Sequence, residues 1–175
     1  TYTAYTMTGK VAPRTGNNHP AFQPYSMFHS SDGFLVSPGA FGPGVFNRCI
    51  PAMGLGVEYF NSKDCSSGPA AVASPKGREL NDTVVAWCAS HTAAQIESAM
   101  EGARVPSATV NTAKSAFENE HFRSRNDWIS YEDQTVGAAV TAFGIAPKLS
   151  ETPGQVWRGA PALGQDTDAI LKTIL

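Results

Sequence analysis

The chain has 175 residues, of which 42% are hydrophobic and 16% are charged, and its formal net charge is -2. A chain of this length and composition suits one ordinary domain that can bury a core. The near-neutral charge gives no reason to expect a nucleic-acid partner or an anionic membrane surface. No apolar run approaches the roughly 20 residues that a membrane-spanning helix needs, so we expect no membrane partner.

The cysteines bear on the compartment of the protein, and the first residues bear on whether the sequence is part of a longer chain. Cys49, Cys65 and Cys88 are odd in number and lack a CxxC spacing. This argues against a disulfide framework or a zinc site and favours a reducing compartment, the cytoplasm. The chain opens with TYTAYTMTG, which has neither an initiator Met nor a signal-peptide pattern. We therefore expect it to be a piece of a longer protein.

The first part of the chain predicts a loop followed by a hairpin. Residues 9–24 are polar and rich in Gly, Pro and Asn, which is typical of a loop. Residues 25–28 and 34–37 are expected to be short strands, joined at Asp32-Gly33, where a tight turn needs a positive φ. A helix is expected in the middle of residues 41–53, and residues 54–74 are expected to form a surface loop because they are rich in Gly, Ser and Ala.

Two helices carry clear start signals. Ser74 can cap a helix that has Pro75 at its first position. Thr92 and Gln95 form a capping-box pattern before the next helix, and Gly102 is placed to end it. Apolar residues then recur on one face of each helix, which predicts that these faces are buried: Leu80, Val84, Trp87 and Cys88 in the first, Ile96 and Met100 in the second.

The remaining elements alternate irregularly, which favours an α+β fold with short antiparallel strands and helices over a doubly wound sheet. They are a short buried strand at 105–110, a helix from Asn111 or Thr112 to about Glu120, a hairpin of 128–132 and 136–143 that turns at Asp133-Gln134, and a final helix beginning at Asp166 or Thr167, with Ile170, Leu171, Ile174 and Leu175 on one face.

The segment 147–166, which precedes the final helix, is predicted to be an extended arm. Pro147, Pro153 and Pro161 remove backbone donors and fix φ, so we expect the arm not to fold on itself. Trp157 and Leu163 supply apolar anchors for another surface. The arm is therefore expected to be mobile or to lie on a surface outside this chain.

No complete catalytic or metal-binding motif is present. The chain lacks GxSxG, GxGxxG, GxxxxGK and HExxH patterns. Its histidines, His19, His29, His91 and His121, are scattered and give no pair at ligand spacing, so no metal is expected. Cys65 lies in a polar segment, but only Lys63 is near enough in sequence to activate a thiolate, so a structural role is favoured.

The loop between Gly16 and Tyr25 is the best candidate site. Asn17, His19, Gln23 and Tyr25 place amide, imidazole and phenol groups within a few residues, and loops on a rigid scaffold often carry polar function. The alternative is that Asn and Gly are present here only as turn formers. The residues by themselves leave both interpretations open.

The sequence resembles the class III CoA-transferase (CaiB/BaiF) family, specifically its C-terminal part. The similarity begins with Tyr-x-x-x-Gly-x-x-x-Pro-Arg-x-Gly-Asn at 5–17 and Pro-Tyr-x-x-Phe-x-x-x-Asp-Gly at 24–33, and continues through 105–110. It is most specific at PKL (147–149), PGQVWRG (153–159) and APALGQDTD (160–168). The PGQVWRG run is most similar to the L-carnitine (betainyl) CoA-transferases.

This resemblance implies an interlocked homodimer in which each chain has a large domain and a smaller α+β domain. On this basis residues 1–24 are a linker from the missing large domain, residues 25–146 form the small domain, and residues 147–175 return to the large domain. The family's nucleophile is an aspartate in the N-terminal half, which attacks an acyl-CoA and passes CoA to an acceptor acid. CoA is thus a substrate, and no permanently bound cofactor is expected.

No catalytic residue can be transferred to this chain, because none of its aspartates matches the family's motif. Some members have a glycine-rich loop ending in Gln over the active site. Residues 18–23 occupy the similar place, but only Gln23 matches, so a stiffer and bulkier loop is expected. We expect Asn17, His19, Gln23 and Tyr25 to contact the substrate, with Gln23 and Tyr25 near the acyl group.

Three functional hypotheses follow. The first is the C-terminal part of a CoA-transferase that acts on a carnitine-like carboxylic acid and is inactive without its other half. The second is a CoA-ester racemase, an activity that the same family contains. The third is a non-catalytic fragment or interaction domain.

Overall fold

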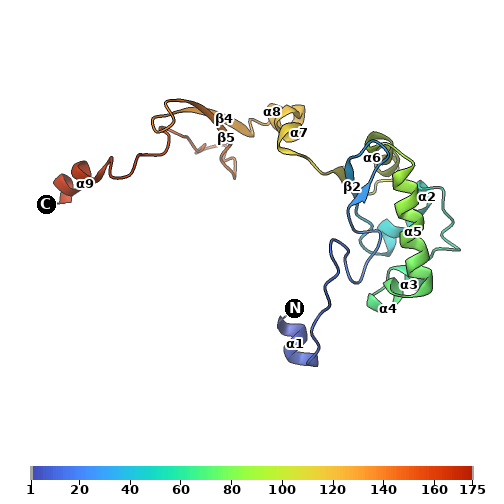
Figure 1. The fold of residues 1–175 in the computed structure, drawn as a ribbon. Coiled ribbons are helices and arrows are strands. Elements are labelled where there is room, and N and C mark those ends of the chain that lie inside the picture. The colour runs from blue at the N-terminus through green and yellow to red at the C-terminus, as the bar shows by residue number, and fades with distance from the viewer. Residues whose placement is uncertain (1, 175) are drawn as a thin grey trace. The chain divides into compact units, whose positions relative to one another are not determined.

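The computed structural model describes residues 2–174, and its contacts divide the chain into two compact units. Unit 1 extends to Val110 and unit 2 begins at Asn111 (Figure 1). Unit 1 contains α1 (Tyr2–Thr8), β1 (Phe28–His29), β2 (Leu35–Pro38), α2 (Pro43–Ala52), α3 (Ser62–Cys65), α4 (Pro69–Val72), α5 (Pro75–Ala89), α6 (Ala93–Gly102) and β3 (Ser107–Thr109). Unit 2 contains α7 (Ala113–Glu118), α8 (Glu120–Ser124), β4 (Trp128–Asp133), β5 (Ala138–Phe143) and α9 (Thr167–Ile174). The α+β class is confirmed.

The sheet of unit 1 is antiparallel, in the order β1-β2-β3. Phe28 pairs with Val36, and the turn between β1 and β2 contains Gly33 at a φ of 85°. The predicted hairpin is therefore present, but its first strand begins at Phe28. Tyr25 forms only an isolated bridge with Gly39.

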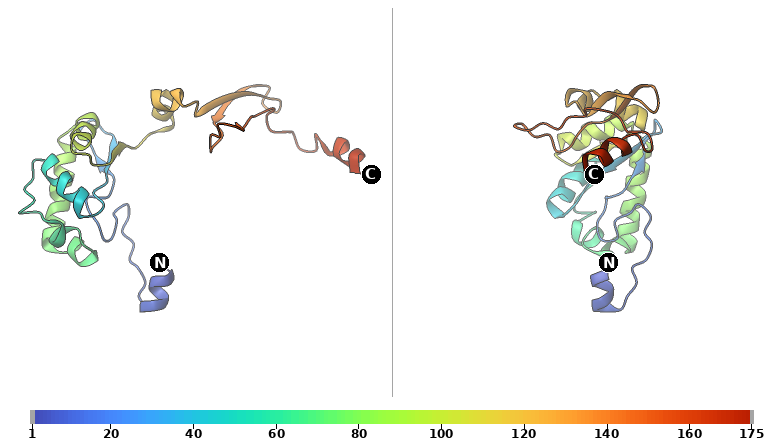
Figure 2. Two further views of the ribbon diagram at one scale, coloured as in Figure 1. Left: turned by 180° about the vertical axis from the view of Figure 1, so that it is seen from behind. Right: turned by 90° about the vertical axis from the view of Figure 1, so that its left-hand side faces the viewer.

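Helices α5, α2 and α6 supply most of the core of unit 1. α5 contacts β1, α6 contacts β2 and β3, and α2 lies against α3 and α6 (Figures 1 and 2). The predicted apolar faces are confirmed except at Trp87, which is only partly buried; both helices bury side chains completely, namely Leu80, Val84 and Cys88 on α5 and Ile96 and Met100 on α6. Burying each such side chain contributes on the order of 1.5–3 kcal/mol.

The predicted helix starts are also confirmed. Ser74 Oγ accepts a 2.9 Å hydrogen bond from the Gly77 amide, with Pro75 in the first helical position. Thr92 and Gln95 form the reciprocal capping box of α6. These local side-chain bonds satisfy amides that a helix start leaves without a partner.

Two expectations for unit 1 need correction. Residues 54–74 are not a plain surface loop, because they form α3 and α4 and bury Phe60 and Cys65. The strand expected over 105–110 is limited to β3, whose Ala108 is exposed. Among the described residues, no helix is both long and apolar enough to cross a bilayer.

Unit 2 follows the predicted pattern with one break. The expected helix begins at the Thr112 cap but is interrupted at Asn119, whose ψ of 122° separates α7 from α8. β4 and β5 pair in register from Trp128–Phe143 to Asp133–Ala138. α9 exposes Ile170, Leu171 and Ile174, while Leu175 lies outside the described residues.

The arm differs from its prediction, because it folds back on the β4–β5 hairpin. Thr135 Oγ1 donates to the Ala160 carbonyl at 3.1 Å, and Lys148 Nζ contacts the Asp127 carboxylate at 2.5 Å. The expected anchor Trp157 stays 79% exposed, although the Arg158 guanidinium lies 4.7 Å from its ring centre. Polar contacts, rather than the apolar anchors, hold the arm within unit 2.

Candidate functional site

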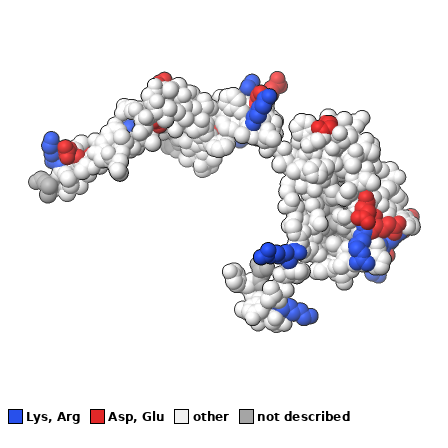
Figure 3. All heavy atoms as spheres, viewed as in Figure 1, with Lys and Arg blue, Asp and Glu red and all other residues white. Residues whose placement is uncertain are grey.

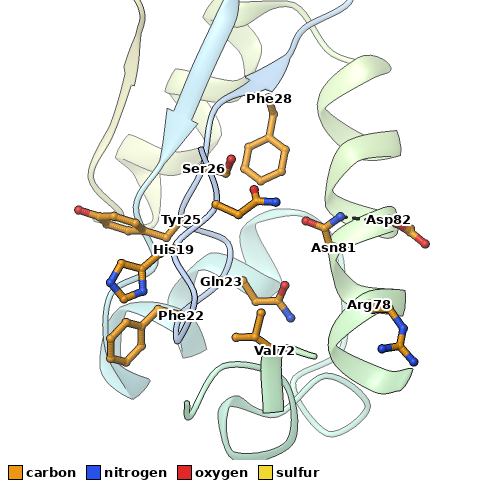
Figure 4. A pocket seen from close by; sticks show the side chains of 11 residues that line it. His19, Phe22, Gln23, Tyr25, Ser26, Phe28, Val72, Arg78, Asn81 and Asp82 are labelled. Atoms are coloured by element: carbon orange, nitrogen blue, oxygen red, sulfur yellow. Dashed lines mark hydrogen bonds between the residues drawn. The ribbon is translucent and has the colours of Figure 1, made fainter. Parts of the chain in front are cut away.

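The candidate loop and one side of α5 enclose a cavity in unit 1. Its volume is about 290 Å³, and it is lined by Asn18, His19, Phe22, Gln23, Tyr25, Ser26, Phe28, Val72, Arg78, Asn81 and Asp82. Figure 4 shows these side chains arriving from the loop, from β1 and from α5. Three of the four predicted site residues, His19, Gln23 and Tyr25, therefore lie around one cavity.

Gln23 is buried within the loop, with only 7% of its surface exposed. Its side-chain nitrogen donates to the carbonyl oxygens of Cys65 and Gly77, each at 2.7 Å. Its backbone amide donates to Ser66 Oγ at 2.9 Å. The loop is thus attached to α3 and α5 by bonds from both the backbone and the side chain of one residue.

Aromatic rings form the opposite rim of the cavity. The His19 ring lies 5.0 Å from Phe22 and 5.5 Å from Tyr25, and Phe22 lies 4.7 Å from Phe41. His19 Nδ1 accepts a 3.2 Å hydrogen bond from the Ala21 amide, which assigns the acceptor role to this ring nitrogen. Tyr25 lines the cavity and remains 44% exposed, whereas Phe41 is 60% exposed and packs on Phe22 without lining the cavity.

The polar wall on α5 was missed by the sequence reasoning. Arg78, Asn81 and Asp82 recur at helical spacing beside the buried Leu80, so they mark the half of α5 that flanks its core face. This helical spacing was the available sequence signal, but it does not predict which loop lies opposite this side of α5. The Arg78 guanidinium donates to the Ala73 carbonyl, and Figure 4 shows it turned away from the cavity.

Asn17 does not line this cavity. It borders a neighbouring groove of about 450 Å³, which is also lined by Tyr25, by Ser37 of β2 and by Ser107 and Ala108 of β3. Tyr25 lines both spaces.

The other chemically active side chains lie elsewhere. Cys65 is buried, and burial raises the pKa of its thiol, which agrees with the structural role expected for it. His91 stacks on Trp87 at 4.4 Å and sits at the start of α6. Residues 2–174 contain no group of three His, Cys, Asp or Glu side chains placed to hold a metal ion. On the face drawn in Figure 3, most of the surface of unit 1 carries no charge.

The fold agrees with what known proteins show. The model of CoA-transferase family III matches residues 1–167, and the chain belongs to that family. A succinyl-CoA–D-citramalate CoA-transferase of Chloroflexus aurantiacus is 32% identical over 98% of the chain, and a bile acid CoA-transferase, BaiK, of Clostridium scindens is 28% identical over 97%. The chain spans 42% and 39% of the lengths of these relatives.

A solved structure shares the fold. A CAIB/BAIF family protein from Brucella suis superimposes with a TM-score of 0.67 at 20% identity, covering 99% of this chain and 43% of that protein. The similarity to the carnitine-specific members that the PGQVWRG run suggested is not repeated among the relatives described above, which act on citramalate and bile acids by name.

Proposed function

We propose that this chain is the C-terminal part of a CoA-transferase that moves CoA between an acyl-CoA and a small carboxylic acid. The observation that carries the proposal is the family match over residues 1–167. The relatives are named as CoA-transferases and are more than twice as long as this chain. The cavity adds a binding space of about 290 Å³, a size that suits a small acid better than a sterol.

The chemistry would begin in the part of the protein that lies outside this chain. An aspartate carboxylate there would attack the thioester, forming a mixed anhydride and freeing the CoA thiolate. The thiolate would then attack the aspartyl carbonyl, which releases the donor acid and leaves an aspartyl-CoA thioester for the acceptor acid. Splitting the transfer in this way replaces one difficult step by easier ones. CoA enters and leaves as a substrate, without a permanently bound cofactor.

In this scheme unit 1 holds the part of the acid that does not react. His19, Gln23 and Tyr25 line that space, and Asn17 borders the groove beside it. Residues 1–24 would join this part to the large domain, residues 25–146 would form the small domain, and residues 147–175 would return to the large domain of an interlocked homodimer in the cytoplasm.

The acceptor acid belongs to one of two classes. A carnitine-like acid is supported by the cluster of His19, Phe22, Tyr25 and Phe41, because aromatic faces attract quaternary ammonium groups. A hydroxy dicarboxylic acid is supported by relatives named for citramalate and malate. Both classes are small acids that carry a hydroxyl group.

Incubation of the whole protein, including the sequence upstream of Thr1, with one CoA ester and a panel of acids tests the proposal. Mass spectrometry of the CoA esters is expected to show CoA on a new acid. Epimerisation of the ester without exchange would assign the protein to the racemases instead. If neither reaction is detected, a non-catalytic role would remain. The 175-residue chain alone is expected to be inactive, and turnover by it would contradict the placement of the nucleophile.

A further inference from the structure

We propose that Gln23 selects acceptor acids that carry a hydroxyl group, by accepting a hydrogen bond from that hydroxyl. This inference rests on the proposed function and narrows its substrate class. It follows from the way in which the side-chain amide of Gln23 is fixed.

The orientation of the Gln23 amide is determined by its neighbours. Two of its contacts are the backbone carbonyl oxygens of Cys65 and Gly77, each 2.7 Å away. A carbonyl oxygen accepts hydrogen bonds and cannot donate them, so the atom that faces both must be the nitrogen. Both N–H donors of the amide are thereby used, and Oε1 is fixed on the other side.

Oε1 is left as an acceptor in the cavity. It has no hydrogen-bond partner among residues 2–174, and it is not among the side-chain atoms that are sealed from solvent without a partner. Figure 4 shows it turned to the same space as the side-chain oxygen of Asn81. Because Gln23 is only 7% exposed, a ligand that fills the cavity must either donate a hydrogen bond to Oε1 or leave it unpaired.

This requirement discriminates between acids of nearly the same shape. A hydroxyl group donates to Oε1, whereas a hydrogen in its place leaves a buried acceptor without a partner. A site built to bind a hydroxyl rejects the analogue that lacks it. The amide cannot turn over to relieve the loss, since its oxygen would then face two carbonyl oxygens.

The test compares matched acids on the whole, unmodified protein. Malate is compared with succinate, citramalate with methylsuccinate, and carnitine with its deoxy analogue, each as acceptor with one fixed CoA donor. We expect kcat/KM to be about 10- to 100-fold higher for the hydroxy acid of the pair that is accepted. Equal values within that pair would overturn the role of Gln23 and leave the transferase intact. Transfer to none of the acids would refute the proposed function itself.

The amide groups of CoA are a second source of hydrogen-bond donors to Oε1. A variant of Gln23 distinguishes them from the hydroxyl group of the acid. In Gln23→Met the preference for the hydroxy acid is expected to fall to about 1- to 3-fold. A rise in KM for the CoA ester with an unchanged preference would show that Oε1 binds CoA instead. Gln95→Met, which removes an exposed amide on α6, is the matched control and is expected to keep the preference. If Gln23→Met does not fold, the comparison of acids on the unmodified protein still decides.

Discussion

The carbonyl oxygen of Gly77 accepts a 2.7 Å hydrogen bond from Gln23 Nε2, which joins the first turn of α5 to a loop 54 residues earlier. Gly77 is also a point of close approach to α4. A Cβ atom at this position would lie 2.3 Å from the Ala71 carbonyl oxygen and 2.5 Å from that of Val72. The same residue thus holds the loop and lets α4 approach α5.

Gly77→Ala is therefore expected to destabilise the chain by about 1–3 kcal/mol, because backbone atoms must move to admit the methyl group. Urea unfolding followed by circular dichroism measures this change. Gly102→Ala, at the end of α6, is the control, since a Cβ there meets nothing within 4 Å. Equal stabilities of Gly77→Ala and the unmodified chain would contradict the packing described here.

The cysteines are expected to resist alkylation in the folded chain. Cys49, Cys65 and Cys88 are all buried and outside disulfides, and burial raises the pKa of each thiol. Little thiolate is then present near neutral pH to react. Iodoacetamide labelling followed by mass spectrometry should modify the three residues slowly before urea is added and fully afterwards. Rapid labelling of Cys65 under native conditions would restore a reactive role for it.

Stability is expected to fall at alkaline pH. Burial raises the pKa of the Cys49 thiol from 9.0 to about 12 and that of Cys88 to about 11. Above about pH 9 the unfolded chain loses these protons while the folded chain keeps them, so the free energy of unfolding declines as the pH rises. Each such thiol adds a slope of up to about 1.4 kcal/mol per pH unit. Urea titrations from pH 8 to about pH 11 test this.

The control for this pH dependence is Cys49→Ala, in which the alkaline slope should be smaller although the protein is less stable throughout. An unchanged slope in that variant would assign the alkaline loss to other groups.

The aromatic rim gives a prediction for binding. Phe41 is 60% exposed and packs at 4.7 Å on Phe22, which lines the cavity, so Phe41→Ala should loosen this wall at little cost in stability. In the whole protein we expect the KM for the acid to rise roughly 2- to 10-fold. Phe143→Ala, on the exposed side of β5, is the comparison. If both variants had the same KM as the parent, Phe41 would have no part in the site.

Sequence patterns predicted the elements whose signals are local. The caps at Ser74 and Thr92 and the buried face of α5 are of this kind, since a few neighbouring residues determine them. The helices α3 and α4 were missed because four residues are too few to show a period. The Asn61 cap of α3 was the available clue, as its side chain accepts from the Asp64 amide.

The site was predicted only in part for a different reason. The loop could be recognised by its clustered polar groups, but its contacts with Cys65 and Gly77 cross 42 and 54 residues. No local pattern shows such a pairing. The sequence therefore indicated that His19, Gln23 and Tyr25 lie close together, whereas the opposite cavity wall on α5 could be recognised only from the fold.

The anchoring of Gln23 separates two tasks within the loop. Its backbone and amide nitrogen fix the end of the loop to α3 and α5, while Asn18, His19 and Phe22 line the adjoining part of the cavity wall. Substitutions at residues 18–22 can change the shape of the cavity without removing the hydrogen bonds of Gln23 that attach the loop. An engineer who wishes to retarget this scaffold to another acid can therefore randomise residues 18–22 as a cassette and keep Gln23 and Gly77 constant.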